Sequence, residues 1–156
     1  MSDPILYTII RNLQAALGAM TVAGGYYYAV AVAVVKLDPN HKVEDLIAPD
    51  GPRPFIVLEV KPEAWNYLPA NEVRLVVPMT VYWIGASTPT VDESRLLVFT
   101  RGCADVERAI AVDITRGGLP VDTRIVKCTK EPSTEAAQVW AMVDIEVRLY
   151  RTFGAP

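Results

Sequence analysis

The chain has 156 residues, 51% of them apolar, and a formal net charge of −3 from 15 basic and 18 acidic side chains. This length fits one domain, so we expect residues 1–156 to fold as a single unit that needs no metal or disulfide to hold its core. The acidic balance and the lack of a Lys/Arg cluster argue against a dedicated nucleic-acid binder. The apolar fraction is slightly above the roughly 45–50% usual for soluble domains, which indicates a larger core, a membrane segment or surface covered by another chain.

Residues that carry catalytic or metal chemistry are few. Cys103 and Cys128 have no metal-ligand spacing, and we expect two reduced, mostly buried thiols of a cytosolic product. The single histidine, His41, excludes a multi-histidine metal site, and because we expect it to be solvated in its loop, it does not support a His-dependent triad. No Gly-rich nucleotide-binding loop is present. We therefore expect a protein without metal, nucleotide or other cofactor, and not an enzyme.

The first elements differ in the period of their apolar residues. A helical stripe predicts a helix over about Pro4–Ala19, through Ile5, Ile9, Leu13 and Leu17. Alternation predicts a first strand over about Tyr26–Leu37, with Tyr26 and Tyr28 on its bulky face and alanines on the other. Residues 15–35 carry no charge and are long enough to cross a bilayer. Because Gly24-Gly25 interrupt them and the period changes there, we expect no membrane span.

Two loops separate the next strands. The proline-rich stretch Asp38–Pro54 predicts a long, partly mobile loop, and Phe55–Val60 predicts the second strand. Lys61–Asn71 predicts a second loop, and a third strand is expected from Glu72 to about Ile84. Pro78 lies inside that strand and cannot donate to the ladder, so it indicates an edge position or a bulge.

The second half of the chain predicts one helix and two strands. The helix begins at Thr88–Thr90 and continues to about Asp113, before Gly117-Gly118. Leu96, Leu97 and Ile110 belong to its broad apolar side, and Gly102 is a point where it could bend or divide. Strands follow at Val121–Thr129 and Gln138–Arg151. The order α-β-β-β-α-β-β predicts an α+β fold, in which two helices pack on one face of a mixed, mostly antiparallel sheet of about five strands.

Charged side chains on these elements have ordinary interpretations. Asp144 and Glu146 share a strand face, as paired catalytic carboxylates can, but Arg148 continues the row. A cross-strand charge ladder is the better interpretation. On the second helix, Asp105 and Glu107 are expected on a solvated face, pairing locally with Arg108 or Arg101.

Aromatic side chains in exposed settings point instead to a contact surface. Because aromatic residues are favoured interface anchors, we predict a subunit or partner interface at Trp65, Tyr67, Leu68, Tyr26, Tyr28, Trp140 and Tyr150. For Trp65 the alternative, folding back over the sheet edge, is equally supported. For Tyr67 the interface is favoured.

One stretch carries a family resemblance. Residues Ala104–Asp113, followed by Gly117-Gly118-Leu119, are similar to the second helix and Gly-Gly-Leu turn of the tail terminator (tail-completion) proteins of long-tailed bacteriophages. The amphipathic first helix ahead of a strand and the long final strand Val139–Arg151 also resemble that family. The two loops Asp38–Pro54 and Lys61–Asn71 depart from it, so their partners cannot be assigned by analogy.

The resemblance implies a structural role in the virion, assembled in the host cytoplasm. Such proteins form a ring, usually of six subunits, on the last ring of the tail tube. There they stop tube polymerisation and dock the connector of the head. The implied partners are other copies of the chain, the tail tube protein and the head–tail connector or stopper, with no membrane. DNA is implied only as cargo through the channel, and a net charge of −3 on each copy would repel its phosphates.

Two rival interpretations remain open at this point. One is a neighbouring neck protein, a stopper or adaptor. The other, from a different class, is a small-molecule enzyme on an α+β sheet. A deep pocket with converging polar groups would favour the enzyme, and ring formation would favour either neck role.

Overall fold

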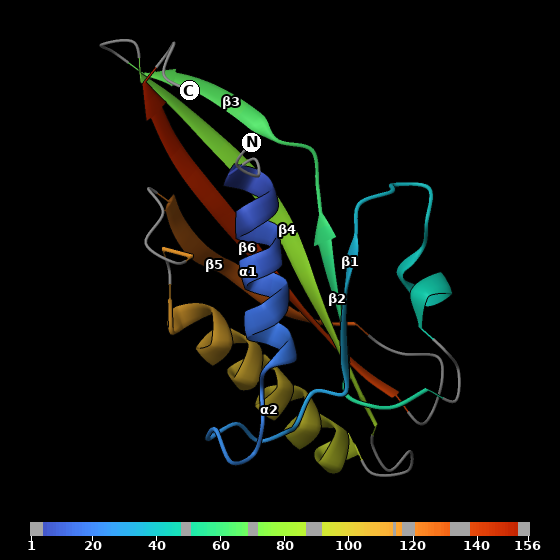
Figure 1. Cartoon of the computed structure of the whole chain (residues 1–156). Helices are drawn as coiled ribbons and strands as arrows, with labels where there is room; N and C mark the ends of the chain where they lie inside the picture. Colours follow the sequence, from blue (N-terminus) through green and yellow to red (C-terminus); the bar gives the residue numbers. More distant parts are fainter. Residues whose placement is uncertain are drawn as a thin grey trace.

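The computed structural model describes residues 5–47, 51–68, 72–86, 92–113, 115–116, 121–131 and 138–152, with backbone alone for 64–68, 72–73, 86, 92–94, 121, 130–131, 138 and 150–152. Figure 1 shows the elements, which in chain order are α1 (Ile5–Gly18), β1 (Val32–Lys36), the 3-10 helix η1 (Val43–Leu46), β2 (Phe55–Val60), β3 (Ala64–Leu68), β4 (Glu72–Ala86), α2 (Asp92–Ala111), β5 (Val121–Glu131) and β6 (Gln138–Thr152).

The strands form one six-stranded sheet in the order β1-β2-β4-β6-β5. The strand β3 pairs with β4 beyond the end of β2, so β2 and β3 lie one after the other along the same side of β4. Only the β1–β2 pair is parallel among these pairings. The expected α+β class and mixed, mostly antiparallel sheet are confirmed, with one strand more than expected.

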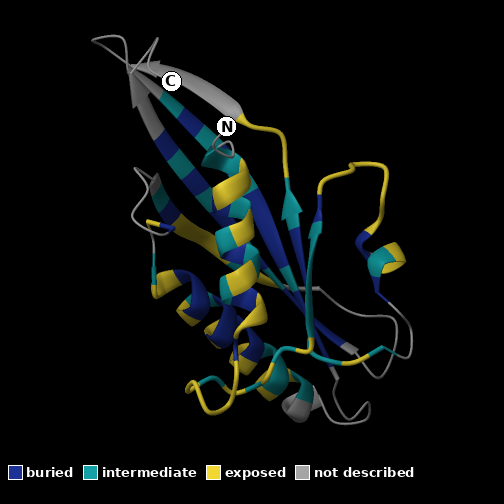
Figure 2. Cartoon of the chain, viewed as in Figure 1, coloured by how far each residue is buried: buried dark blue, intermediate teal, exposed yellow. Residues whose placement is uncertain are grey.

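Both helices cover the same face of the sheet and form the main core with it (Figures 1 and 2). Ile9, Leu13 and Leu17 of α1 are fully buried, as the helical stripe predicted. On β6 the alternation also holds, because every second side chain from Val139 to Leu149 is buried. The helix α2 is continuous through Gly102, so it is not divided there. The expectation that Leu96 and Leu97 lie on its apolar side is wrong, because both are exposed.

The opposite face of the sheet carries a second, smaller core. Residues Asp38–Ile47, expected as part of a loop, contain η1 and pack on this face through Val43 and Ile47. Their partners from the sheet include Phe55, Val57, Ile84 and Trp140. The segment therefore closes part of a face that the two helices leave uncovered.

Two expectations about the extent of strands need correction. The first strand is short, because Tyr26–Ala31 lies outside the sheet and β1 begins only at Val32. The stretch Lys61–Asn71, expected as a loop, contains β3. The reason in both cases is pairing: a run becomes a strand only where a neighbouring backbone can satisfy its N–H and C=O groups.

Pro78 does not lie on an edge strand, since β4 is central and its register with β6 is continuous across the proline. Its carbonyl accepts a hydrogen bond from the N–H of Lys61, 3.0 Å away. Because the N and C=O of a strand residue point to the same side, the missing N–H faces the interruption between β2 and β3. The proline therefore removes no hydrogen bond between β4 and β6.

Cys103 of α2 and Cys128 of β5 form a disulfide, which corrects the expectation of two free thiols. The two residues are 25 positions apart and come together only because α2 packs beside the edge strand β5. No spacing rule in the sequence reveals such a pair.

Candidate assembly surface

The segment of three tyrosines, Tyr26–Tyr28, follows a tight turn at the end of α1. The carbonyl of Thr21 accepts hydrogen bonds from the N–H groups of Gly24 and Tyr26, at 3.1 and 3.3 Å. Gly25 has a φ of 90°, a conformation that residues with a Cβ rarely adopt. The turn directs the tyrosines across α2 instead of into the sheet.

Asp105 fixes this segment to α2. Its two carboxylate oxygens accept hydrogen bonds from the backbone N–H groups of Tyr27 and Tyr28, each at 2.9 Å. The residue is only 2% exposed, so the expected solvated face is wrong at this position. A charged acceptor with two backbone donors is one of the stronger hydrogen-bonded arrangements in proteins, and here it ties residues almost 80 positions apart.

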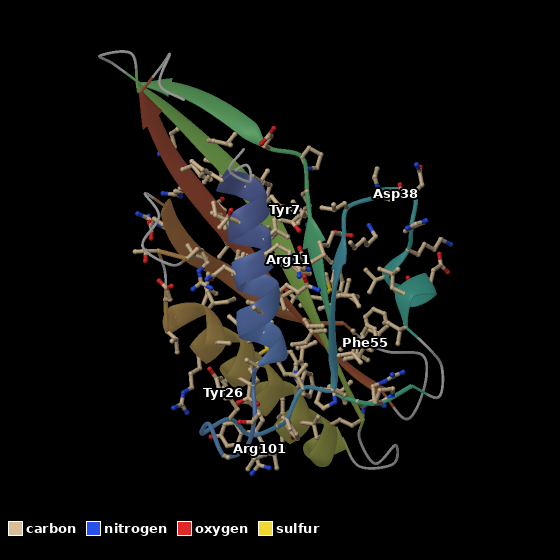
Figure 3. The ribbon with its side chains drawn as sticks, viewed as in Figure 1. Tyr7, Arg11, Tyr26, Asp38, Phe55 and Arg101 are labelled. Carbon is tan, nitrogen blue, oxygen red and sulfur yellow. A yellow bond between two sulfur atoms is a disulfide. The ribbon has the colours of Figure 1, made fainter. Side chains whose placement is uncertain are left out.

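Two arginines of α2 lie over the rings of the same segment. The guanidinium of Arg101 is 5.2 Å from the ring centre of Tyr27, and that of Arg108 is 5.2 Å from the ring centre of Tyr26. Arg108 also donates a hydrogen bond to the carbonyl of Gly25. Each contact is worth about 0.5–1 kcal/mol at an exposed site. We call Tyr26, Tyr27, Arg101 and Arg108 the cation–aromatic patch (Figure 3, where Tyr26 and Arg101 are labelled).

The patch is exposed on one side and anchored on the other. Tyr27 is 58% exposed, whereas Tyr28 turns inward and packs against Trp83, with ring centres 5.3 Å apart. Tyr26 is half-buried against the main core. Of the two predicted tyrosines, Tyr26 therefore belongs to the exposed patch and Tyr28 to its support.

The other predicted interface residues do not belong to this patch. Trp140 is buried in the second core, with its ring nearly perpendicular to that of Tyr82 and the ring centres 6.3 Å apart, so it is not an exposed anchor. The side chains of Trp65, Tyr67, Leu68 and Tyr150 lie outside the described residues. Their backbones are in β3 and β6, where Trp65 lies opposite Leu75 and Tyr67 opposite Val73.

Three features of this surface were not predicted from the sequence: Tyr27, Arg101 and the role of Asp105. One signal was present: Arg101, Asp105 and Arg108 are spaced by four and three residues, which places them on one helix face. A cation–carboxylate–cation row beside a run of tyrosines after Gly-Gly is the pattern that could have found the patch. This pattern does not reveal that the carboxylate of Asp105 accepts hydrogen bonds from backbone N–H groups.

The stretch after α2 forms a turn of its own. The carboxylate of Asp113 accepts hydrogen bonds from the N–H and the hydroxyl of Thr115, at 3.0 and 2.7 Å. Arg116, with a φ of 52°, folds back and donates to the carbonyl of Ile110, which satisfies an acceptor at the end of the helix. Burial lowers the pKa of Arg116 below its ordinary value, and the nearby Asp113 opposes this shift. Gly117, Gly118 and Leu119 lie outside the described residues.

The outer sheet face carries a polar row across five strands. Lys36, Glu59, Thr80, Asp144 and Lys127 are successive register partners on β1, β2, β4, β6 and β5. Lys36 pairs with Glu59 at 2.7 Å, the hydroxyl of Thr80 donates to Asp144 at 2.7 Å, and Lys127 lies 3.9 Å from the same carboxylate. The predicted cross-strand ladder is confirmed at Asp144, while Glu146 pairs with Arg148 along its own strand at 2.9 Å.

Groups suited to catalysis do not converge elsewhere in the described part of the chain. His41 is exposed, as expected, and lies 3.6 Å from Asp38. No group of three or more His, Cys, Asp or Glu side chains in the described ranges is placed to hold a metal ion. A groove of about 490 Å³ runs beside the ends of β1 and β2, but its buried Lys36 already pairs with the partly buried Glu59.

No known family model and no curated protein sequence matches this chain. Within the described residues, neither helix combines the length and apolar character needed to cross a bilayer.

Proposed function

We propose that this chain is a structural virion protein that forms a ring at the head-proximal end of a phage tail tube. In this role it stops tube polymerisation and provides the docking surface for the head connector. Its partners are other copies of itself, six in a ring by family resemblance, the tail tube protein and the connector or stopper. DNA passes through the ring as cargo, and the protein carries out no catalysis.

The observation that carries the proposal joins the resemblance to the geometry. Ala104–Asp113, the stretch that resembles the tail terminators, contains Asp105 and Arg108. These two residues hold the Tyr26–Tyr28 segment on the surface of α2. The stretch that bears the likeness is therefore the one that organises an exposed, rigid aromatic surface, and such surfaces are typical of protein–protein contacts.

The extended sheet adds support. The strands β4 and β6 are 15 residues long each and pair along their whole length. Figure 1 shows the end of the sheet that carries β3 reaching beyond the start of α1 and away from α2. A sheet that extends past its covering helices offers backbone groups at its edges to a neighbouring subunit, which suits assembly better than the enclosure of a small substrate.

The test is native mass spectrometry of the purified chain, alone and mixed with the tail tube protein of its own phage. We expect a closed ring, of six copies by the resemblance, either alone or on the end of the tube. A chain that remains monomeric at all concentrations and never binds the tube overturns the proposal.

The length of the tails distinguishes a terminator from a neighbouring neck protein, a stopper or adaptor. Without a terminator, tails should be irregular and excessively long, and they should not join heads. Without a stopper or adaptor, tails should have normal length and fail only to join. Electron microscopy of particles produced without this chain therefore decides between the two. A small-molecule enzyme would instead leave assembled particles unchanged.

A further inference from the structure

Two exposed surfaces of opposite charge lie on opposite faces of the sheet. On the helix side, the cation–aromatic patch presents Arg101 and Tyr27, with Leu97 exposed one helical turn from Arg101. On the other side, residues 38–47 carry three carboxylates and one lysine. We call Asp38, Glu44 and Asp45 the acidic turn. Figure 3 shows Arg101 and Asp38 on different sides of the molecule.

We propose that the cation–aromatic patch of one copy binds the acidic turn of the next copy, in a head-to-tail contact that builds the ring. The inference rests on the proposed function and names the surfaces through which that ring would form.

The patch is suited to a carboxylate partner. The guanidinium carbon of Arg101 lies 5.2 Å from the ring centre of Tyr27, and that of Arg108 lies 5.2 Å from the ring centre of Tyr26, where Arg108 also donates to the carbonyl of Gly25. Arg101 is exposed, and because a guanidinium carries its five N–H donors in one plane, a carboxylate of another copy can accept two hydrogen bonds from it. Tyr27 is more than half exposed and adds an aromatic anchor beside the guanidinium of Arg101.

The acidic turn is held rigid by apolar residues from its own length. Val43 and Ile47 are 7% and 9% exposed and pack in the second core, which leaves Glu44 and Asp45 on the outside. Asp45 accepts a hydrogen bond from the N–H of Lys42, and Asp38 accepts one from the N–H of Asn40. Because both surfaces are fixed before contact, little conformational entropy is lost when they meet.

The placement of the two surfaces decides the kind of assembly. A two-fold dimer joins the same patch on each copy, whereas two different patches on opposite faces join copies head to tail. Each copy then offers one unused patch to the following copy, and the chain of contacts closes when the rotation between copies allows it. Opposite charge gives such a contact its register and suppresses the like-with-like arrangement.

A charge exchange tests the contact directly. Arg101→Glu and Glu44→Lys each place like charges across the interface, and each should weaken ring formation about tenfold or more. The double variant Arg101→Glu/Glu44→Lys restores opposite charges in reversed order, so rings should return. Arg11→Glu on α1 makes the same charge change as Arg101→Glu at an exposed position outside both surfaces, and should assemble like the wild type.

The measurement is ring fraction against concentration, by native mass spectrometry and sedimentation, with circular dichroism to confirm that each variant is folded. If the wild type forms rings and the single variants form them equally well, the contact lies elsewhere and only this inference falls. The same holds if the double variant stays as weak as the singles. If the wild type forms no ring, alone or on tail tubes, the proposed function falls and the contact with it.

Discussion

Gly102 of α2 lies directly against the ring of Trp83, the largest fully buried side chain of the core. A Cβ added to Gly102 would come within 2.5 Å of the ring atom Cε3. The helix thus approaches β4 more closely at this turn than any residue with a side chain permits. Gly102, a point where the helix could bend or divide, is the point at which the continuous helix meets the sheet.

Gly102→Ala should therefore destabilise the fold. Alanine favours a helix by about 1 kcal/mol over glycine, but overpacking against a buried ring typically costs about 1–3 kcal/mol, so we expect the clash to prevail. Gly18→Ala is the control, because its Cβ would lie 3.5 Å from the Cβ of Ala33, an ordinary contact. Urea denaturation measures both variants. A Gly102→Ala protein as stable as the wild type would show that α2 does not pack this closely.

Asp105→Ala should cost about 2–4 kcal/mol, because it removes a charged acceptor from two backbone N–H groups. Hydrogen exchange should accelerate at the amides of Tyr27 and Tyr28 before it does in the sheet. Glu107→Ala changes a half-exposed carboxylate on the same helix and should alter stability by less than about 0.5 kcal/mol. Unchanged exchange at the two tyrosine amides in Asp105→Ala would contradict the bonding described above.

Leu13→Ala should lower the free energy of unfolding by about 2–5 kcal/mol, as other truncations of buried leucines do. Leu13 is fully buried between α1 and the sheet, whereas Arg11 is exposed on the same helix. Arg11→Ala is therefore the matched control and should have little effect. An unchanged denaturation midpoint for Leu13→Ala would mean that the apolar stripe of α1 does not face the core.

Reduction of the Cys103–Cys128 disulfide should lower stability by about 3 kcal/mol, the size expected for a closed loop of this length. Melting curves with and without dithiothreitol measure the effect. The Cys128→Ala variant should melt at one temperature in both conditions. Two titratable thiols in the oxidised, denatured wild type would instead support the original expectation of free cysteines.

Tyr67→Ala and Trp65→Asp remain predictions from the sequence, since only the backbone of β3 is described. We expect both variants to fold but to assemble less well, with a loss of more than about 2 kcal/mol if either residue is a hot spot. Circular dichroism checks the fold and electron microscopy checks tail length and attachment to heads. Normal tails joined to heads in both variants would exclude β3 from the interface.

The sequence alone determined the elements whose signal is local. The bounds of β2 agree with the expected strand, and the helical stripe of α1 and the alternation of β6 agree with the buried side chains. These patterns can be recognised in the sequence because each helix or strand has its own period of apolar residues. That period is the same whichever element packs on the apolar face.

Only the tertiary structure decided features that depend on a distant partner. Asp105 looks like a solvated helix residue until the N–H groups of Tyr27 and Tyr28 reach it from almost 80 positions away. Trp140 alternates outward on β6 and is buried only because η1 packs on that face. Burial and pairing of such groups are set by the segment that lies opposite, and the period of a single strand or helix carries no information about that segment.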